Sequence, residues 1–101
     1  MEQYYVGTDL KFKINLSAAG FSMDEDDFLI EIFCSSKRME YKKEDLIDST
    51  DGYYLVIDTT QFPAGQMKMV VTAFVPDEDI PGGVRKEVGV CDLCTIKKPL
   101  K

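Results

Sequence analysis

The sequence predicts an all-β protein built as a β-sandwich of six to seven mostly antiparallel strands. Short segments in which apolar and polar residues alternate recur along the chain, and turn signals separate them at roughly 8–12-residue spacing. No segment longer than a turn or two carries the periodicity of a helix. The 101 residues leave room for a single domain, spanning residues 1–101, with one core.

The first half of the chain supplies the clearest strands. Leu10–Ser17 alternates apolar and polar residues, which predicts a strand with one buried face. A second strand is expected over Phe28–Ser35, with every second residue from Phe28 to Cys34 facing the core. The charged segment Ser36–Lys43 predicts an edge strand, because lysine and arginine discourage pairing with other chains. A short strand over Tyr4–Val6 is a further candidate.

The middle of the chain alternates turns with one strand. Glu44–Asp51 is polar and predicts a turn from which Leu46 and Ile47 point inward. An Asp-Gly pair at its end is a strong turn signal, so a strand is expected over Tyr53–Asp58. Residues 58–65 contain a proline and a glycine, which predicts a compact crossover between the two sheets.

Two longer strands are expected near the C-terminus, over Gln66–Val75 and Arg85–Ile96, with a loop between them. In the last strand Val88 and Val90 share the phase of the apolar residues near its end, but an aspartate interrupts that phase. A β-bulge near Gly89–Asp92 would reconcile the two halves.

Composition and charge exclude several classes of function. The net charge of -6 argues against nucleic acid and an anionic membrane as partners. No apolar stretch is long enough to cross a bilayer, and the N-terminal residues do not resemble a signal peptide. The chain contains no histidine to activate a serine and no glycine-rich phosphate loop. We therefore expect a non-enzymatic protein with no cofactor and no small-molecule substrate.

The three cysteines include one pair with the spacing of metal and redox motifs, Cys91 and Cys94. A zinc site needs four ligands, and Cys34 is the remaining cysteine. The pair also lies in an expected strand, where neighbouring side chains alternate. We expect reduced thiols that pack as small hydrophobic groups, with no metal, and keep a small metal or redox protein as an alternative.

Two acidic loops are candidate recognition elements, Ala18–Asp27 and Pro76–Gly83, because loops at the ends of a sandwich often carry binding residues. The second loop contributes Asp77 and Asp79 as candidate partner-binding residues. Carboxylates in such loops are solvated turn residues, ligands of a weak Ca²⁺ site or contacts to a basic partner. The spacing of an EF-hand is absent.

Several strands carry apolar residues opposite their expected core face. The candidate partner-binding residues of this kind are Leu29, Phe33, Tyr54, Val70 and Phe74. If several of them share one surface, the apolar patch exceeds what a monomer usually exposes and indicates docking or self-association. The alternative is that the inner face has been misassigned, or that loops cover these residues.

A resemblance to a known class of proteins lies in turn and strand signatures along nearly the whole chain. These signatures are Gly7–Phe12, Gly20–Phe28, Asp51–Tyr54, Asp58–Thr60 and Thr72–Val88. They resemble small Ig-like proteins encoded by tailed phages and prophages of gut Bacteroides-type bacteria, including crAss-like phages. The general layout is also similar to the Ig-like N-terminal domain of phage baseplate upper proteins.

This resemblance implies an Ig-like β-sandwich with a structural role in the virion. Such a protein is an auxiliary capsid protein, a head-fibre component or a tail adaptor, made in the bacterial cytoplasm and bound to other virion proteins or to itself. It supplies no active-site residues, and the absence of a further domain favours a small accessory protein over a baseplate scaffold. The alternative function is an Ig-like binding module that recognises a glycan or a host surface, with a weak Ca²⁺ site.

Overall fold

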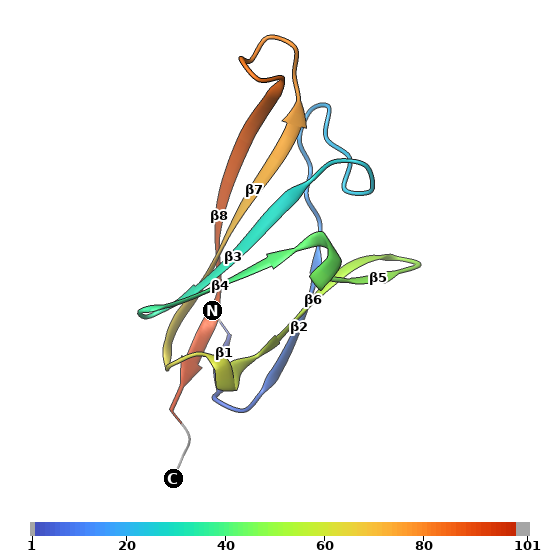
Figure 1. The fold of residues 1–101 in the computed structure, drawn as a ribbon. Helices are drawn as coiled ribbons and strands as arrows, with labels where there is room; N and C mark the ends of the chain where they lie inside the picture. Colours follow the sequence, from blue (N-terminus) through green and yellow to red (C-terminus); the bar gives the residue numbers. More distant parts are fainter. Residues whose placement is uncertain (1, 99–101) are drawn as a thin grey trace.

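The computed structural model describes residues 2–98, which form two β-sheets packed face to face (Figure 1). The strands and the two 3₁₀ turns are β1 (Gln3–Tyr5), β2 (Asp9–Ile14), β3 (Phe28–Cys34), β4 (Lys37–Lys42), η1 (Lys43–Asp45), β5 (Ile47–Ser49), β6 (Gly52–Asp58), η2 (Thr59–Gln61), β7 (Gly65–Pro76) and β8 (Val84–Lys97). Within residues 2–98, no helix is long and apolar enough to cross a membrane.

The strand order confirms the expected fold class, an all-β Ig-like sandwich. One sheet has five strands in the order β1-β8-β7-β3-β4, and the other has three in the order β2-β6-β5. With β2, β3, β6, β7 and β8 as strands B, C, E, F and G, this is the B-E-D and G-F-C arrangement of Ig domains. All neighbours are antiparallel except β1 and β8, which run parallel.

β1 corresponds to the candidate strand over Tyr4–Val6, and the three-residue β5 is the strand that the sequence did not predict. The segment predicted to be a turn between Glu44 and Asp51 is in fact η1 followed by β5. Leu46 is buried, as expected, but the inward prediction for Ile47 is wrong, since its side chain is 49% exposed. The reason is that Ile47 pairs with Tyr54 in the sheet, which turns its side chain outward.

The core lies between the two sheets and follows the predicted alternation. Every second residue of β3 from Phe28 to Cys34 is buried, and so are Met67, Val71, Ala73 and Val75 of β7. Leu10 and Ile14 of β2, together with Leu55 and Ile57 of β6, face them from the other sheet. Successive strand residues point to opposite faces, so this alternation also defines the outer face of each sheet.

The predicted crossover between the sheets is present, and it contains the 3₁₀ turn η2. Thr59 is fully buried there, and its Oγ1 donates to the Thr8 carbonyl at 2.6 Å and accepts from the Gly7 amide at 2.8 Å. Gly65 follows with a φ of +148°, and a Cβ at this position would lie 2.3 Å from Ser35 Oγ. A side chain at position 65 would therefore clash with the β3–β4 turn.

The bulge in β8 lies one residue further along than predicted. Met67 pairs with Cys94 and Lys68 pairs with Asp92, which leaves Leu93 as the extra residue. The prediction that Val88 and Val90 share a face with the end of the strand is therefore wrong. The extra residue at the bulge shifts the alternation, and both valines point away from the core.

A candidate docking surface on the five-stranded sheet

The outer face of the five-stranded sheet is the side turned away from β2, β5 and β6. In β7, Val71 and Ala73 are buried, so the alternate residues Val70, Thr72 and Phe74 lie on this outer face. In antiparallel strands, directly opposite residues point to the same side of the sheet. The pairing register therefore identifies the outer residues of the neighbouring strands.

Apolar residues from three strands meet on this outer face. Thr72 lies opposite Leu29 of β3 and Val88 of β8, and Val70 lies opposite Val90. Val88 and Val90 are 63% and 67% exposed, whereas the β3 and β7 residues are half-buried. We call Leu29, Val70, Phe74, Val88 and Val90 the apolar strip. Contiguous exposed apolar residues of this kind mark interaction surfaces in soluble proteins.

Charged residues border the apolar strip at one end. Arg38 Nε lies 2.7 Å from Glu31 Oε2, and Lys68 Nζ lies 3.8 Å from Asp92 Oδ1. Phe33 lies between these pairs, opposite both Arg38 and Lys68. Such exposed ion pairs contribute at most about 1 kcal/mol each to stability. They leave charged atoms at the border of the apolar strip, which is the arrangement of a protein interface with a polar rim.

A hollow of about 370 Å³ lies beside the strip, at the β4 side of the sheet. Leu29 and Phe74 contribute its apolar walls, and Glu40, Lys42 and Glu44 contribute charged groups. Lys43 Nζ lies 5.6 Å from the centroid of the Phe28 ring, which also lines the hollow. The hollow could accept a side chain of a docking partner, with charged groups at hand to fix its orientation.

The structure brings four of the candidate partner-binding residues together on the outer face: Leu29, Phe33, Val70 and Phe74. Tyr54 lies elsewhere, on the outer face of the three-stranded sheet. Its hydroxyl donates to Asp51 Oδ2 at 2.6 Å, and this hydrogen bond raises the pKa of Tyr54. Lys11 Nζ sits 4.7 Å above the centroid of its ring, so both parts of the side chain have internal partners.

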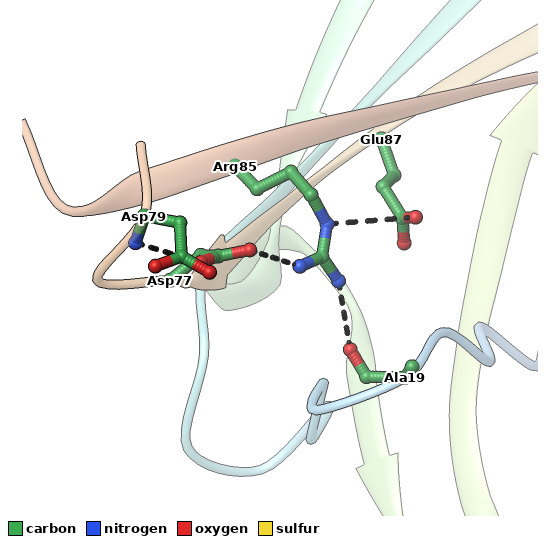
Figure 2. Close-up of polar contacts among 5 residues, drawn as sticks. All are labelled: Ala19, Asp77, Asp79, Arg85 and Glu87. Carbon is green, nitrogen blue, oxygen red and sulfur yellow. Dashed lines mark hydrogen bonds and ion pairs between the residues drawn. The ribbon is translucent and has the colours of Figure 1, made fainter. Parts of the chain in front are cut away.

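Asp77 and Asp79 lie in the loop between β7 and β8. Arg85, near the start of β8, contacts this loop, its own strand and the β2–β3 loop (Figure 2). The guanidinium of Arg85 forms an ion pair with Asp77 and lies 3.7 Å from Glu87 Oε1. Its Nη2 donates to the Ala19 carbonyl at 2.9 Å, which ties the β2–β3 loop to the β7–β8 hairpin.

Asp77 is therefore engaged within the molecule, whereas Asp79 has an exposed side chain. The Asp79 amide donates to Asp77 Oδ1 at 3.0 Å. This hydrogen bond and the ion pair with Arg85 lower the pKa of Asp77 below its usual value. Of the two candidate loop residues, Asp79 is the one free to contact a partner.

The carboxylates of the β2–β3 loop also serve as local acceptors. Asp24 Oδ1 accepts from the Tyr53 hydroxyl at 2.7 Å, and this bond raises the pKa of Tyr53 to about 12. Asp26 Oδ2 accepts from the Ser22 amide at 2.9 Å. Within residues 2–98, the acidic and cysteine side chains form no cluster that could hold a metal ion.

The cysteines occupy two different environments. Cys34 and Cys94 are buried on either side of Met67, and burial raises the pKa of both thiols. Cys91 is exposed, and all three cysteines are free thiols. The bulge at Leu93 leaves Cys91 opposite Met69 and Cys94 opposite Met67, so both thiols lie on the inner side of the sheet. The expectation that their side chains point to opposite faces is therefore wrong, although Cys91 remains exposed whereas Cys94 is buried in the core.

Sequence reasoning missed Val88 and Val90, the most exposed members of the apolar strip. The available signal was that the charged residues Lys86 and Asp92 share the phase of the valines, which disfavours that phase for the core. Arg85 and Glu87, in the alternate phase, gave the opposite indication. The local pattern does not reveal where the bulge lies, because the pairing of β8 with β7 determines which residue is extra.

Comparisons with known proteins identify no family. No protein-family model matches the chain, and no curated protein matches it. A similar solved structure is that of a candidate glycoside hydrolase from Bacteroides vulgatus, with 14% sequence identity and a TM-score of 0.48. The match covers 100% of this chain but only 17% of that protein. At this TM-score the likeness carries no argument about the activity of the chain.

Proposed function

We propose that this chain is a non-enzymatic structural accessory protein of a phage particle, which docks on capsid or tail proteins through the outer face of its five-stranded sheet. The observation that carries this proposal is the apolar strip, in which exposed Val88 and Val90 extend the half-buried residues of β3 and β7. A rigid sheet that presents a contiguous apolar surface can bind a partner with little loss of conformational entropy.

Three carboxylates with shifted pKa values are held in place by hydrogen bonds within the molecule. Asp51, Asp58 and Asp77 have lowered pKa values because hydrogen bonds within turns stabilise their charged forms. A general acid at neutral pH needs the opposite shift, with the proton retained on the carboxyl group. These carboxylates therefore fit a role in shaping loops.

The resemblance of the turn and strand signatures to small Ig-like phage proteins supports a virion protein as the partner. The net charge of -6 is compatible with a protein surface and unfavourable for packaged nucleic acid. Docking on a repeated virion protein would place many copies of the chain in one particle.

Mass spectrometry of purified particles from the source culture tests this proposal. We expect the chain to be present at a fixed ratio to the major capsid protein. Many copies per particle indicate a head protein, and few copies indicate a tail or fibre component. Absence of the chain from clean particles would contradict the virion role.

The hollow beside the strip favours a second candidate function, the recognition of a glycan or host surface. Its volume of about 370 Å³ lies at the lower end of the range for small-ligand sites, and it combines aromatic Phe74 with charged groups. Binding on a glycan array that is lost in Phe74→Ala but kept in Tyr54→Phe would support this function. No binding to any glycan on the array would contradict it.

A further inference from the structure

The long strand β8 has an unpaired edge along most of its length. β1 covers one edge only at Thr95–Lys97, and among residues 2–98 no strand lies beside Val84–Leu93 on that side. In Figure 1 this part of β8 forms the outer border of the sheet. Such an edge presents unpaired amide and carbonyl groups that can pair with another strand.

The other edges of the two sheets are short or protected by charge. β4 carries Lys37, Arg38 and Lys42, and β5 is only three residues long. β2 alternates lysines with its core residues. By contrast, β8 carries no lysine, arginine or proline over residues 87–91, where Glu87 is the one charged residue.

We propose that two copies of this chain pair antiparallel along the free edges of β8, with a two-fold axis at Gly89. In this register Val88 of each copy lies opposite Val90 of the other, and Lys86 lies opposite Asp92 of the other. The two five-stranded sheets then form one continuous sheet with both apolar strips on the same side. This inference goes beyond the proposed function and does not depend on the identity of the virion partner.

Charge complementarity selects this register. Lys86 has no ion pair within residues 2–98, whereas Asp92 lies near Lys68 with about half of its side chain exposed. Pairing about Gly89 joins Lys86 and Asp92 twice across the interface and places apolar residues between them. Opposite charges in directly opposed positions stabilise antiparallel strands.

Neighbouring registers lose these contacts. An axis at Val88 places Lys86 opposite Val90, and an axis at Val90 places Val88 opposite Asp92. A register displaced by one residue turns the second copy over, so that outer residues oppose inner ones and the apolar strips face opposite sides. The pairing about Gly89 is therefore the one that matches both charge and face.

The position of Gly89 suits the centre of such an interface. A Cβ at this residue would meet no atom within 4 Å, and its φ is not in the left-handed region. Directly opposite residues of antiparallel strands have Cα atoms about 4.5–5.5 Å apart, which lies within the range of a disulfide. A cysteine introduced at position 89 thus reports the register directly.

Sedimentation equilibrium of the full chain tests the dimer. We expect the mass to rise with concentration from 11.4 kDa towards twice that value. The double variant Val88→Lys, Val90→Lys should stay monomeric, because it places four like charges at the interface. Val56→Lys is the matched control, since Val56 is an exposed valine on the other sheet, and it should still dimerise. A wild-type chain that is monomeric throughout, or a double variant that dimerises normally, would overturn the proposal.

Charge reversal supplies a second test that leaves the valines intact. Lys86→Glu should weaken dimerisation by about tenfold, because two attractions become two repulsions. Adding Asp92→Lys to this variant should restore dimerisation. Failure of the second substitution to restore it would overturn the proposed pairing of these residues.

Disulfide trapping then examines the register. In a Cys91→Ser background, Gly89→Cys should form a covalent dimer on mild oxidation, whereas Lys86→Cys should do so at least about tenfold more slowly because its opposite residue is Asp92. Equal trapping at both positions, or faster trapping at position 86, would contradict the two-fold axis at Gly89. The virion proposal is judged separately by the composition of particles.

Discussion

The two halves of β8 differ in burial and in edge pairing, although they belong to one strand. In the C-terminal half, Leu93–Lys97, Cys94 and Ile96 are buried and β1 covers the edge. In the N-terminal half, Val84–Asp92, two valines are among the most exposed apolar residues of the described chain and the edge is unpaired. The comparison shows that hydrophobic alternation specifies the core only where a second layer covers the strand. Elsewhere the same residue types are available for docking.

The largest expected contrast between the halves is in thiol reactivity. In dilute solution, a thiol reagent should modify exposed Cys91 at once, whereas buried Cys94 should react at least about a thousandfold more slowly because it requires unfolding. Mass spectrometry of peptides after timed labelling measures both rates. Equal rates at the two cysteines would show that the folded C-terminal half of β8 does not protect Cys94 from the reagent.

Truncation of apolar side chains should separate the halves by free energy of unfolding. Ile96→Ala should lower it by about 2–5 kcal/mol, because the substitution leaves a cavity in a site that is 1% exposed. Val90→Ala should change it by less than about 0.5 kcal/mol, because that side chain is on the surface. Urea unfolding curves measure both values. A loss at Val90 as large as that at Ile96 would contradict the difference in burial.

A smaller effect on stability is expected at the crossover between β6 and β7, which contains η2. Thr59→Val should lower the free energy of unfolding by about 1–3 kcal/mol, because the Gly7 amide and the Thr8 carbonyl lose their partner. Thr60→Val is the matched control, since its hydroxyl binds Asp58 at the exposed surface. If the two variants have the same urea midpoint, the buried hydrogen bonds of Thr59 do not matter to stability.

The smallest effect on stability is expected at the start of β8, where Asp77 of the β7–β8 loop forms an ion pair with Arg85. The pKa of Asp77 is lowered by the Asp79 amide and by Arg85, so its charged form stabilises the fold above its usual pKa of 3.8. That contribution is lost as the pH falls through the lowered value. Thermal melts of Asp77→Asn and wild type should therefore differ at pH 5 and converge under more acidic conditions. A difference that is constant with pH would exclude the charge of Asp77 as its cause.

The sequence predicted most of the sandwich because its strands are amphipathic where both layers are present. The inner faces of Phe28–Cys34 and Met67–Val75 were correct, and so was the crossover before Gly65. The phase of Val88 and Val90 was wrong, because a bulge at Leu93 depends on the register with β7. The free edge of β8 also could not be predicted, since strand order arises from long-range pairing and not from local pattern.

The dependence on long-range pairing also limited the prediction of the candidate site. Leu29, Phe33, Val70 and Phe74 were recognised as apolar residues opposite the core, and the structure places them on one outer face. Tyr54 has the same pattern but belongs to the other sheet, and Asp77 is held by Arg85. Periodicity reveals which side of a strand a residue occupies, whereas the sheet that contains the strand is a property of the topology.

Incorporation into phage particles tests the central claim most directly. Particles assembled with Phe74→Asp should lack the chain, because the substitution places a charge on the proposed docking face. Those assembled with Val56→Asp should contain it, because Val56 lies on the outer face of the other sheet. Circular dichroism should show both variants folded, and an unfolded Phe74→Asp chain would itself count against the assignment of Phe74 to a docking surface. Equal incorporation of the two folded variants would contradict docking through the five-stranded sheet.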